Sequence, residues 1–333
     1  MIIYGEYKII SISNPLYPDI FDNILDDAVL YATKTGYNIR NAHASFSFNC
    51  LDDSIIVKVN PTILGDPWCQ NQIGLYENDV YKGVYTYTSW ADKKISLTTG
   101  NKKVTIVEGT QNRPGGTGDV LGDFITGIRV FSTVTKVTQG IIVEKIVGLG
   151  DSITSGYKVD YPVINSFLRL FKKENNKAVA VYAYGSAYLA DFASNAEKIV
   201  VAVANIQTLF MGVTTNKYLI IMLGTSDCCA STPAATIQGW YGALLDAIHT
   251  ADATIKIWCI SPIECAHPAF NDATLLDAYR SAITTVVAAR SSYCTHIAGK
   301  TILTYPTDFG DQAHPTTAGT KKLKDAVYAV MYS

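Results

Sequence analysis

Short segments of alternating apolar and polar residues fill the first part of the chain, as expected for strands of antiparallel sheets. The pattern predicts a hairpin over 72–88 with its turn at 77–79, and a second hairpin over 93–109 with its turn at 99–101. Further strands are predicted over 43–50, 54–59 and 124–134. Short strands at this spacing predict a β-sandwich or jelly roll.

The pattern changes at about residue 142, where apolar runs begin to alternate with longer stretches of helical periodicity. The runs are 143–149, 178–184, 217–223, 254–260 and 300–305. The helical stretches are 161–173, 234–251, 272–289 and 317–332, the last with a cap at Thr316 or Thr317. This alternation predicts right-handed crossovers and a parallel five-stranded sheet with helices on both faces. We therefore expect an all-β domain over 1–141 and an α/β domain over 142–333.

Composition narrows the classes of partner. The formal net charge of -2 over 333 residues gives no basic stripe, which excludes a nucleic-acid partner. No apolar run approaches the roughly 18 residues of a membrane span, and the N-terminus lacks the pattern of a secretory signal. We therefore expect a cytoplasmic or virion-associated protein. The seven cysteines form no Cys-x-x-Cys pair, so neither a zinc site nor any other metal or cofactor is expected.

Chemistry-bearing residues follow the predicted strands, at the sheet edge where ligands of parallel α/β sheets bind. The clusters are Gly150-Asp151-Ser152-Ile153-Thr154, Gly185-Ser186, Gly224-Thr225-Ser226-Asp227 and Asp311-Gln312-Ala313-His314-Pro315. A serine hydroxyl is a weak nucleophile that needs an adjacent base, and a carboxylate must orient that base. Ser152, His314 and Asp311 are candidates for these roles.

A tetrahedral oxyanion also needs preorganised donors. The backbone N–H groups of Ser152 and Gly185 are candidates, because glycine permits close approach of the backbone to a ligand. The Ser226 hydroxyl would add a further donor.

The blocks GDSIT, YGSA, GTSD and DQAHP resemble those of the SGNH (GDSL-type) hydrolases in order and spacing. The resemblance covers about residues 143–333 and implies a three-layer α/β/α flavodoxin-like fold and ester hydrolysis without metal. It implies Ser152 as nucleophile, Gly185 as oxyanion donor, His314 as base and Asp311 as its orienting acid. One position departs from the family. The third block is usually Gly-x-Asn-Asp, with the Asn amide donating to the oxyanion, and this chain has Ser226 there.

A second acid-x-x-His-Pro pattern, Glu264 to Pro268, follows the fourth apolar run. His314 is favoured over His267 because the family places its base after the fifth run, before the terminal helix. We expect His267 to line the pocket or to lie in an exposed loop. Asp151 and Asp227 are also expected at the pocket, where they brace the loops around the nucleophile.

These observations predict a carboxylic ester hydrolase that removes a short acyl group, acetyl, from a carbohydrate. A β module before an SGNH domain resembles the layout of several carbohydrate acetylesterases, so the first domain is expected to bind glycan or shape one wall of the site. Two alternatives remain open. One is a lipase or thioesterase for longer acyl chains, and the other is a glycan-binding, virion adhesin-like protein with a degenerate esterase domain.

Overall fold

The computed structural model describes residues 2–4, 7–11, 30–33, 36–39, 45–51, 53–59, 71–87, 91–108, 125–130, 135–136, 142–266 and 273–333. His267, which the sequence predicts as a pocket residue, lies outside these ranges. The chain forms two compact units, Met1–Gly140 and Ile141–Ser333.

Antiparallel sheets make up the first unit. One sheet has the strand order β1-β2-β11-β6-β9, another has β12-β5-β10-β7-β8, and β3 pairs with β4. The strands are β1 Ile2–Tyr4, β2 Tyr7–Ser11, β3 Leu30–Thr33, β4 Gly36–Ile39, β5 Ser45–Cys50, β6 Ser54–Val59, β7 Asn71–Glu77, β8 Val80–Tyr87, β9 Ala91–Ser96, β10 Lys102–Glu108, β11 Ile125–Val130 and β12 Thr135–Lys136. Both five-stranded sheets bury apolar side chains, Ile55 and Ile95 from the first and Ile73 and Ile106 from the second. Two such sheets are the elements of a β-sandwich.

The two predicted hairpins have different outcomes. Strands β7 and β8 pair antiparallel, and the turn residues Asn78 and Asp79 take positive φ, so the first hairpin is confirmed. The second is wrong, because β9 pairs with β6 in one sheet whereas β10 pairs with β5 and β7 in the other. The segment between β9 and β10 crosses between sheets, and the amide of Thr98 in it donates to the buried Glu77 carboxylate. Local alternation of apolar residues does not distinguish a hairpin from such a crossing.

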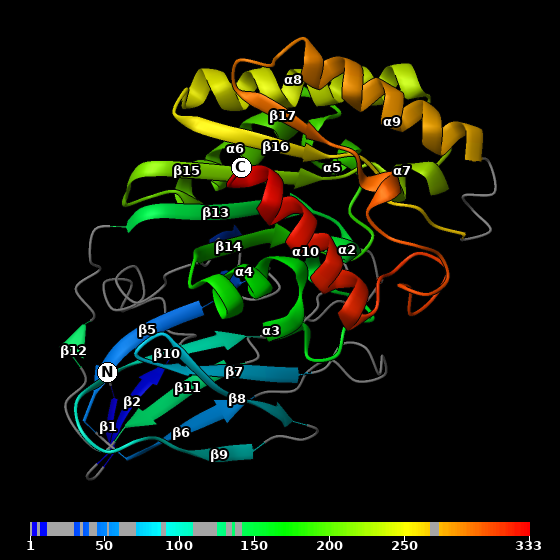
Figure 1. The fold of residues 1–333 in the computed structure, drawn as a ribbon. Coiled ribbons are helices and arrows are strands. Elements are labelled where there is room, and N and C mark those ends of the chain that lie inside the picture. Colours follow the sequence, from blue (N-terminus) through cyan, green and yellow to red (C-terminus); the bar gives the residue numbers. More distant parts are fainter. Residues whose placement is uncertain are drawn as a thin grey trace. The chain divides into compact units, whose positions relative to one another are not determined.

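The second unit is built on a parallel sheet with the strand order β14-β13-β15-β16-β17 (Figure 1). Its strands are β13 Ile142–Gly150, β14 Ala178–Ala183, β15 Val213–Met222, β16 Ile255–Ile260 and β17 Cys294–Ile297. Its helices are α2 Ser152–Ser155, α3 Pro162–Asn165, α4 Phe167–Asn175, α5 Leu189–Ala193, α6 Ala196–Leu209, α7 Thr225–Cys229, α8 Ala234–Ala251, α9 Ala273–Ala288, the 3-10 helix η2 Gly299–Thr301 and α10 Thr317–Met331.

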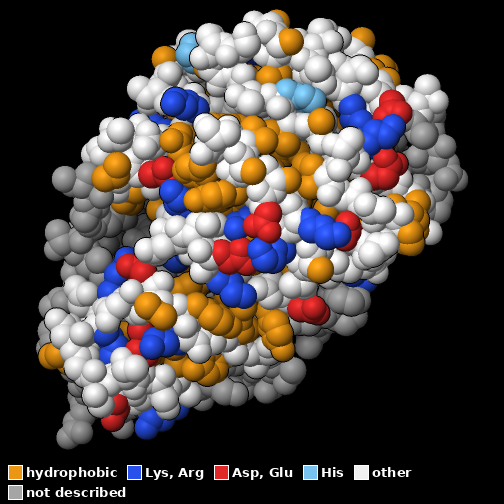
Figure 2. Space-filling model, in the orientation of Figure 1, with side chains coloured by type: hydrophobic (Ala, Val, Ile, Leu, Met, Phe, Trp, Pro, Cys, Tyr) orange, Lys and Arg blue, Asp and Glu red, His pale blue; other side chains and the backbone are white. Residues whose placement is uncertain are grey.

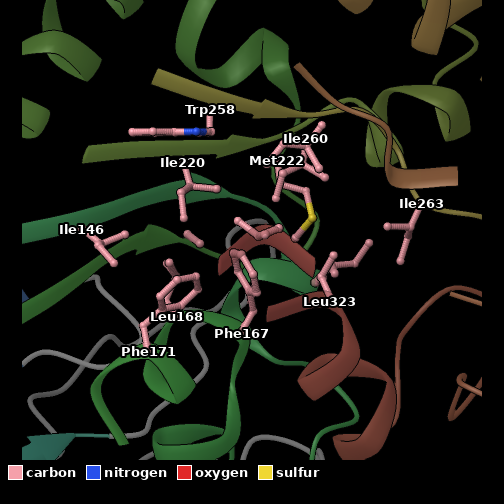
Figure 3. Packing of buried hydrophobic residues seen from close by; sticks show 14 of the residues in the cluster. Ile146, Phe167, Leu168, Phe171, Ile220, Met222, Trp258, Ile260, Ile263 and Leu323 are labelled. Carbon is pink, nitrogen blue, oxygen red and sulfur yellow. The ribbon is translucent and has the colours of Figure 1, made fainter. Parts of the chain in front are cut away.

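Helices cover both faces of this sheet. Helices α4 and α10 lie on one face, where Phe167, Leu168 and Leu323 pack against Ile146 and Ile220 of the sheet (Figure 3). Helices α6, α8 and α9 lie on the other face (Figure 1). The predicted three-layer α/β/α arrangement is confirmed, and burial of apolar side chains on both faces accounts for the continuous apolar runs of its strands.

The fifth strand was placed wrongly from the sequence. The run 300–305 forms η2 and the loop after it, whereas the strand is Cys294–Ile297. This edge strand pairs with β16 alone, and its two middle residues, Thr295 and His296, are polar, so it has no continuous apolar run. Gly299 then begins η2, and only glycine fits there, because a Cβ would lie 1.9 Å from the carbonyl oxygen of Ser261.

The predicted helix over 161–173 is also interrupted, since Ser166 is extended between α3 and α4. The last helix begins as expected. The Thr316 hydroxyl accepts from the amide of Gly319 at 3.1 Å, which confirms the predicted cap.

Ion pairs join α10 to α4, one from an exposed lysine and one from a buried lysine. Lys321 and Lys324 both pair with Glu174 of α4, at 3.2 and 2.8 Å. Figure 2 shows Lys and Arg side chains mixed with Asp and Glu side chains on this face of the molecule. None of the helices in the described ranges is long and apolar enough to cross a membrane.

Candidate active site

Ser152 lies at the start of α2, directly after β13, an interior strand of the sheet. Asp151 caps the helix, and its Oδ1 accepts from the amide of Ile153 at 2.9 Å. Gly150 keeps the turn tight, because a Cβ there would lie 1.9 Å from the Thr154 hydroxyl oxygen. The turn therefore presents Ser152 half-exposed at the carboxyl edge of the sheet.

His314 lies beside Ser152, with 2.8 Å between the serine Oγ and the imidazole Nε2. Its loop is closed by its own backbone. The Gly310 amide donates to the carbonyl of His314 at 2.8 Å, and the Thr316 amide donates to the carbonyl of Asp308 at 2.8 Å. Lys322 binds the buried Asp308 carboxylate at 2.5 Å. These contacts hold the histidine in place before any ligand arrives.

Asp311 holds the other nitrogen of the imidazole. Its carboxylate oxygens lie 3.1 and 3.0 Å from Nδ1, and Oδ1 also accepts from the amides of Ala313 and His314 at 2.8 and 2.7 Å. Burial acts to raise the pKa of Asp311, but these hydrogen bonds outweigh it and hold the pKa well below its ordinary value. An ionised Asp311 accepts the Nδ1 proton, and this assigns Nε2 as the acceptor for the Ser152 hydroxyl.

The two other candidate oxyanion residues follow the strands on either side of β13. Gly185 comes after β14 and Ser226 lies in α7 after β15, so the strand order places Ser152 between them. A Cβ built on Gly185 would meet no atom within 4 Å, so its surroundings are open. Among the described residues, neither the Gly185 amide nor the Ser226 hydroxyl takes part in a hydrogen bond.

Asp151 and Asp227 form a buried acidic pair next to Ser152. Asp227 accepts from the amide of Leu189 at 2.8 Å, which ties α7 to the start of α5. Burial raises the pKa of Asp227 to about 6. Burial likewise raises the pKa of Asp151 to about 6, the His314 charge lowers it, and the Asp227 charge adds to the rise. This geometry is the one expected of residues that brace the loops around Ser152.

The sequence does not predict the roles of two residues, Tyr157 beside His314 and Arg280 on the loop after β16. The Tyr157 ring lies against the His314 ring, with centroids 4.6 Å apart and planes at 64°. The buried Arg280 donates to the carbonyls of Pro262 and Ile263 at 2.8 and 2.7 Å, in the loop after β16. The only available signal for Tyr157 was its place five residues after Ser152, and Arg280 carried none.

No group of three or more His, Cys, Asp or Glu side chains in the described part of the chain could hold a metal ion. The predicted rival of His314, His267, lies outside that part. The segment before it contacts the histidine loop, since the Ala266 amide donates to the carbonyl of Gln312 at 2.8 Å.

Residues 149–322, just over half of the chain, match the model of the GDSL-like Lipase/Acylhydrolase family. The chain belongs to this family. It is therefore a carboxylic ester hydrolase, as the four sequence blocks predicted. A search of curated proteins found no significant match.

Several solved structures are similar over almost the whole chain, at low sequence identity. A salicylyl-acyltransferase from a tetracycline biosynthetic pathway is 12% identical, with a TM-score of 0.69 over 99% of this chain and 98% of its own. A family two carbohydrate esterase from Clostridium thermocellum, in complex with cellohexaose, is 15% identical, with a TM-score of 0.63 over 97% and 98%. An acetyl xylan esterase from the rumen bacterium Butyrivibrio proteoclasticus is 11% identical, with a TM-score of 0.60 over 98% and 98%. At such identities these similarities establish the fold.

Proposed function

We propose that this hydrolase is a serine esterase that removes short acyl groups, acetyl above all, from carbohydrate. Ser152 is the nucleophile, His314 the general base and Asp311 the residue that orients the base. The observation that carries the proposal is the unbroken hydrogen-bonded series from the Ser152 hydroxyl through both imidazole nitrogens to the Asp311 carboxylate.

In the first half-reaction, Ser152 Oγ attacks the ester carbonyl carbon while its proton passes to His314 Nε2. The amides of Ser152 and Gly185 donate to the oxyanion, and the Ser226 hydroxyl adds a donor where the family has an Asn amide. The tetrahedral intermediate then collapses. The bond to the leaving oxygen breaks, His314 returns the proton to that oxygen, and the sugar alcohol departs from the acyl-enzyme.

In the second half-reaction, His314 takes a proton from water, whose oxygen attacks the acyl carbonyl carbon. The bond to Ser152 Oγ breaks, and His314 protonates that oxygen again. The products are a carboxylic acid and free enzyme. Asp311 stays ionised throughout and balances the imidazolium charge at each stage.

Similarity to solved carbohydrate esterases supports the proposed substrate class. Similar structures include carbohydrate esterases, one in complex with cellohexaose and one an acetyl xylan esterase, and each aligns over both units of this chain. We assign glycan binding to the first unit on the same basis. Fold similarity alone does not define a leaving group, so substrate choice has to be tested on the enzyme itself.

The test measures kcat/KM for p-nitrophenyl esters from acetyl to octanoyl, and acetate release from acetylated xylan, with the wild type and Ser152→Ala. We expect kcat/KM to be highest for acetyl and Ser152→Ala to lower it by at least about 10³-fold. A steep preference for octanoyl would favour the lipase alternative. Wild-type activity no higher than that of Ser152→Ala would favour a degenerate site.

A further inference from the structure

Tyr157 contacts both members of the Ser152–His314 pair. Its amide donates to the carbonyl of Ser152 at 2.9 Å, and the Ser155 hydroxyl donates to the same carbonyl at 3.1 Å. Its side chain packs on the base, with 4.6 Å between the ring centroids. One residue thus has its backbone fixed to the nucleophile and its ring fixed against the histidine.

The turn that carries Tyr157 is anchored at both ends. It starts at Gly156, which has a φ of 84° and where a Cβ would lie 2.6 Å from the Cβ of Ser166, so only glycine fits. It ends at Asp160, whose amide donates to the Thr317 hydroxyl oxygen at 2.9 Å, while that hydroxyl donates to the Asp160 carboxylate at 2.9 Å. Thr317 opens α10 directly after the histidine loop. The turn therefore joins the loop of the nucleophile to the loop of the base.

The Tyr157 contact bears on the orientation of the imidazole. Its hydrogen bonds to Asp311 and Ser152 are made by the two ring nitrogens and fix the line that joins them. A turn of the imidazole about its Cβ–Cγ bond tilts both hydrogen bonds out of the ring plane. Hydrogen bonds weaken steeply with such misalignment. A ring packed against the imidazole opposes the rotation.

We propose that Tyr157 is a positioning residue, whose ring holds the His314 imidazole in line with Ser152 Oγ. This inference rests on the proposed function, because it requires His314 to be the base. Proton transfer through a correctly aligned imidazole belongs to the chemical steps, so loss of the ring should lower kcat and leave KM almost unchanged. The contact is made by the ring, so the phenol hydroxyl should be dispensable.

The experiment compares Tyr157→Leu and Tyr157→Phe in the full chain, with p-nitrophenyl acetate as substrate. We expect Tyr157→Leu to lower kcat by about tenfold with KM within about twofold, in keeping with the usual strength of aromatic pairs. Tyr157→Phe should keep kcat within about twofold of wild type. Tyr293→Leu is the matched control, since Tyr293 stacks on a different histidine, His249, with centroids 3.8 Å apart. Its kcat should equal that of wild type.

Three results would overturn the inference. They are a kcat for Tyr157→Leu within twofold of wild type, a rise in KM at unchanged kcat, and a loss in Tyr157→Phe as large as in Tyr157→Leu. Thermal melts establish that each variant is folded, and Tyr157→Met replaces Tyr157→Leu if the latter is not. Ser152→Ala distinguishes failure of the proposed function from failure of the positioning role. Full activity in Ser152→Ala refutes the proposed function. Its inactivity combined with an unaffected Tyr157→Leu refutes the positioning role alone.

Discussion

Two acidic regions influence the same histidine and have opposite electrostatic character. Asp311 is half-buried and accepts from two amides and the imidazole, so its pKa lies well below the ordinary value in spite of burial. Asp151 is fully buried next to a second carboxyl, Asp227, and burial raises its pKa to about 6 although the Ile153 amide donates to it. The number of donors and the exposure of each carboxyl therefore separate residues of one type into two roles.

This difference supports the proposal that Asp311, and not Asp151 or Asp227, orients His314. A residue that orients an imidazole and balances the imidazolium charge has to stay ionised through the working range of pH, and Asp311 meets that requirement. Asp151 and Asp227 instead bond the amides that begin α2 and α5. They are better suited to holding the loops that surround Ser152.

The largest effect is expected when the shared histidine is removed. His314→Ala should lower kcat/KM for p-nitrophenyl acetate by at least about 10³-fold, because Ser152 then has no base. His267→Ala, which alters the other His-Pro pattern, should keep nearly full activity. The opposite pair of results would transfer the role of base to His267.

The next largest effect concerns the ionised region. Asp311→Asn should lower kcat by about 10²- to 10⁴-fold, because an amide in place of the carboxylate favours the wrong imidazole tautomer. Asp325→Asn is a matched control, since Asp325 is an acidic residue that pairs with Lys321 on α10. Steady-state kinetics of both variants measure this effect. Wild-type activity in Asp311→Asn would contradict the role that separates Asp311 from the buried carboxyls.

Substitution in the buried pair Asp151 and Asp227 should change the free energy of unfolding more than it changes kcat. The pKa of Asp151 is higher in the folded state, about 6, than in an unfolded chain, about 3.9, so the folded state binds the proton more tightly between these values. Its contribution to stability is present below about pH 4 and is lost as pH rises through about 6. Asp151→Asn should therefore gain stability relative to wild type over this range, by about 2 kcal/mol. Urea unfolding at pH 4 to 7 measures this, and a difference that does not vary with pH would disprove it.

A smaller effect is expected at Ser226, the neighbour of Asp227. Ser226→Asn supplies the amide donor of the family and should raise kcat by about tenfold, a fraction of what one oxyanion donor contributes. Ser226→Ala serves as the companion variant. A large loss in Ser226→Asn would show that the serine hydroxyl is already the working donor.

Much of the catalytic unit could be predicted from the sequence because its signals are local. Four of its five strands are apolar runs buried on both faces, and helices such as α8 and α10 follow a clear period. Ser152 and His314 are 162 residues apart in sequence, yet each belongs to a polar block beside a predicted element, and the structure brings them within 2.8 Å. Asp311 could be predicted for the same reason, because it lies only three residues before His314 in the same polar block.

The remainder depends on contacts that no local pattern records. The edge strand Cys294–Ile297 is half polar, and its place is fixed by pairing with β16. The separation of β9 from β10 follows from pairing across two sheets. Tyr157 resembles any loop tyrosine until the fold brings His314 against it. In each case the deciding partner is distant in the sequence.

The most direct test of the account is covalent labelling of the nucleophile with a fluorophosphonate, followed by peptide mass spectrometry. Phosphonylation requires a serine activated by a base and does not depend on the natural substrate. We expect a single adduct on Ser152, which forms slowly or not at all in His314→Ala. An adduct on another residue, or equally fast labelling of Ser152 without His314, would contradict it.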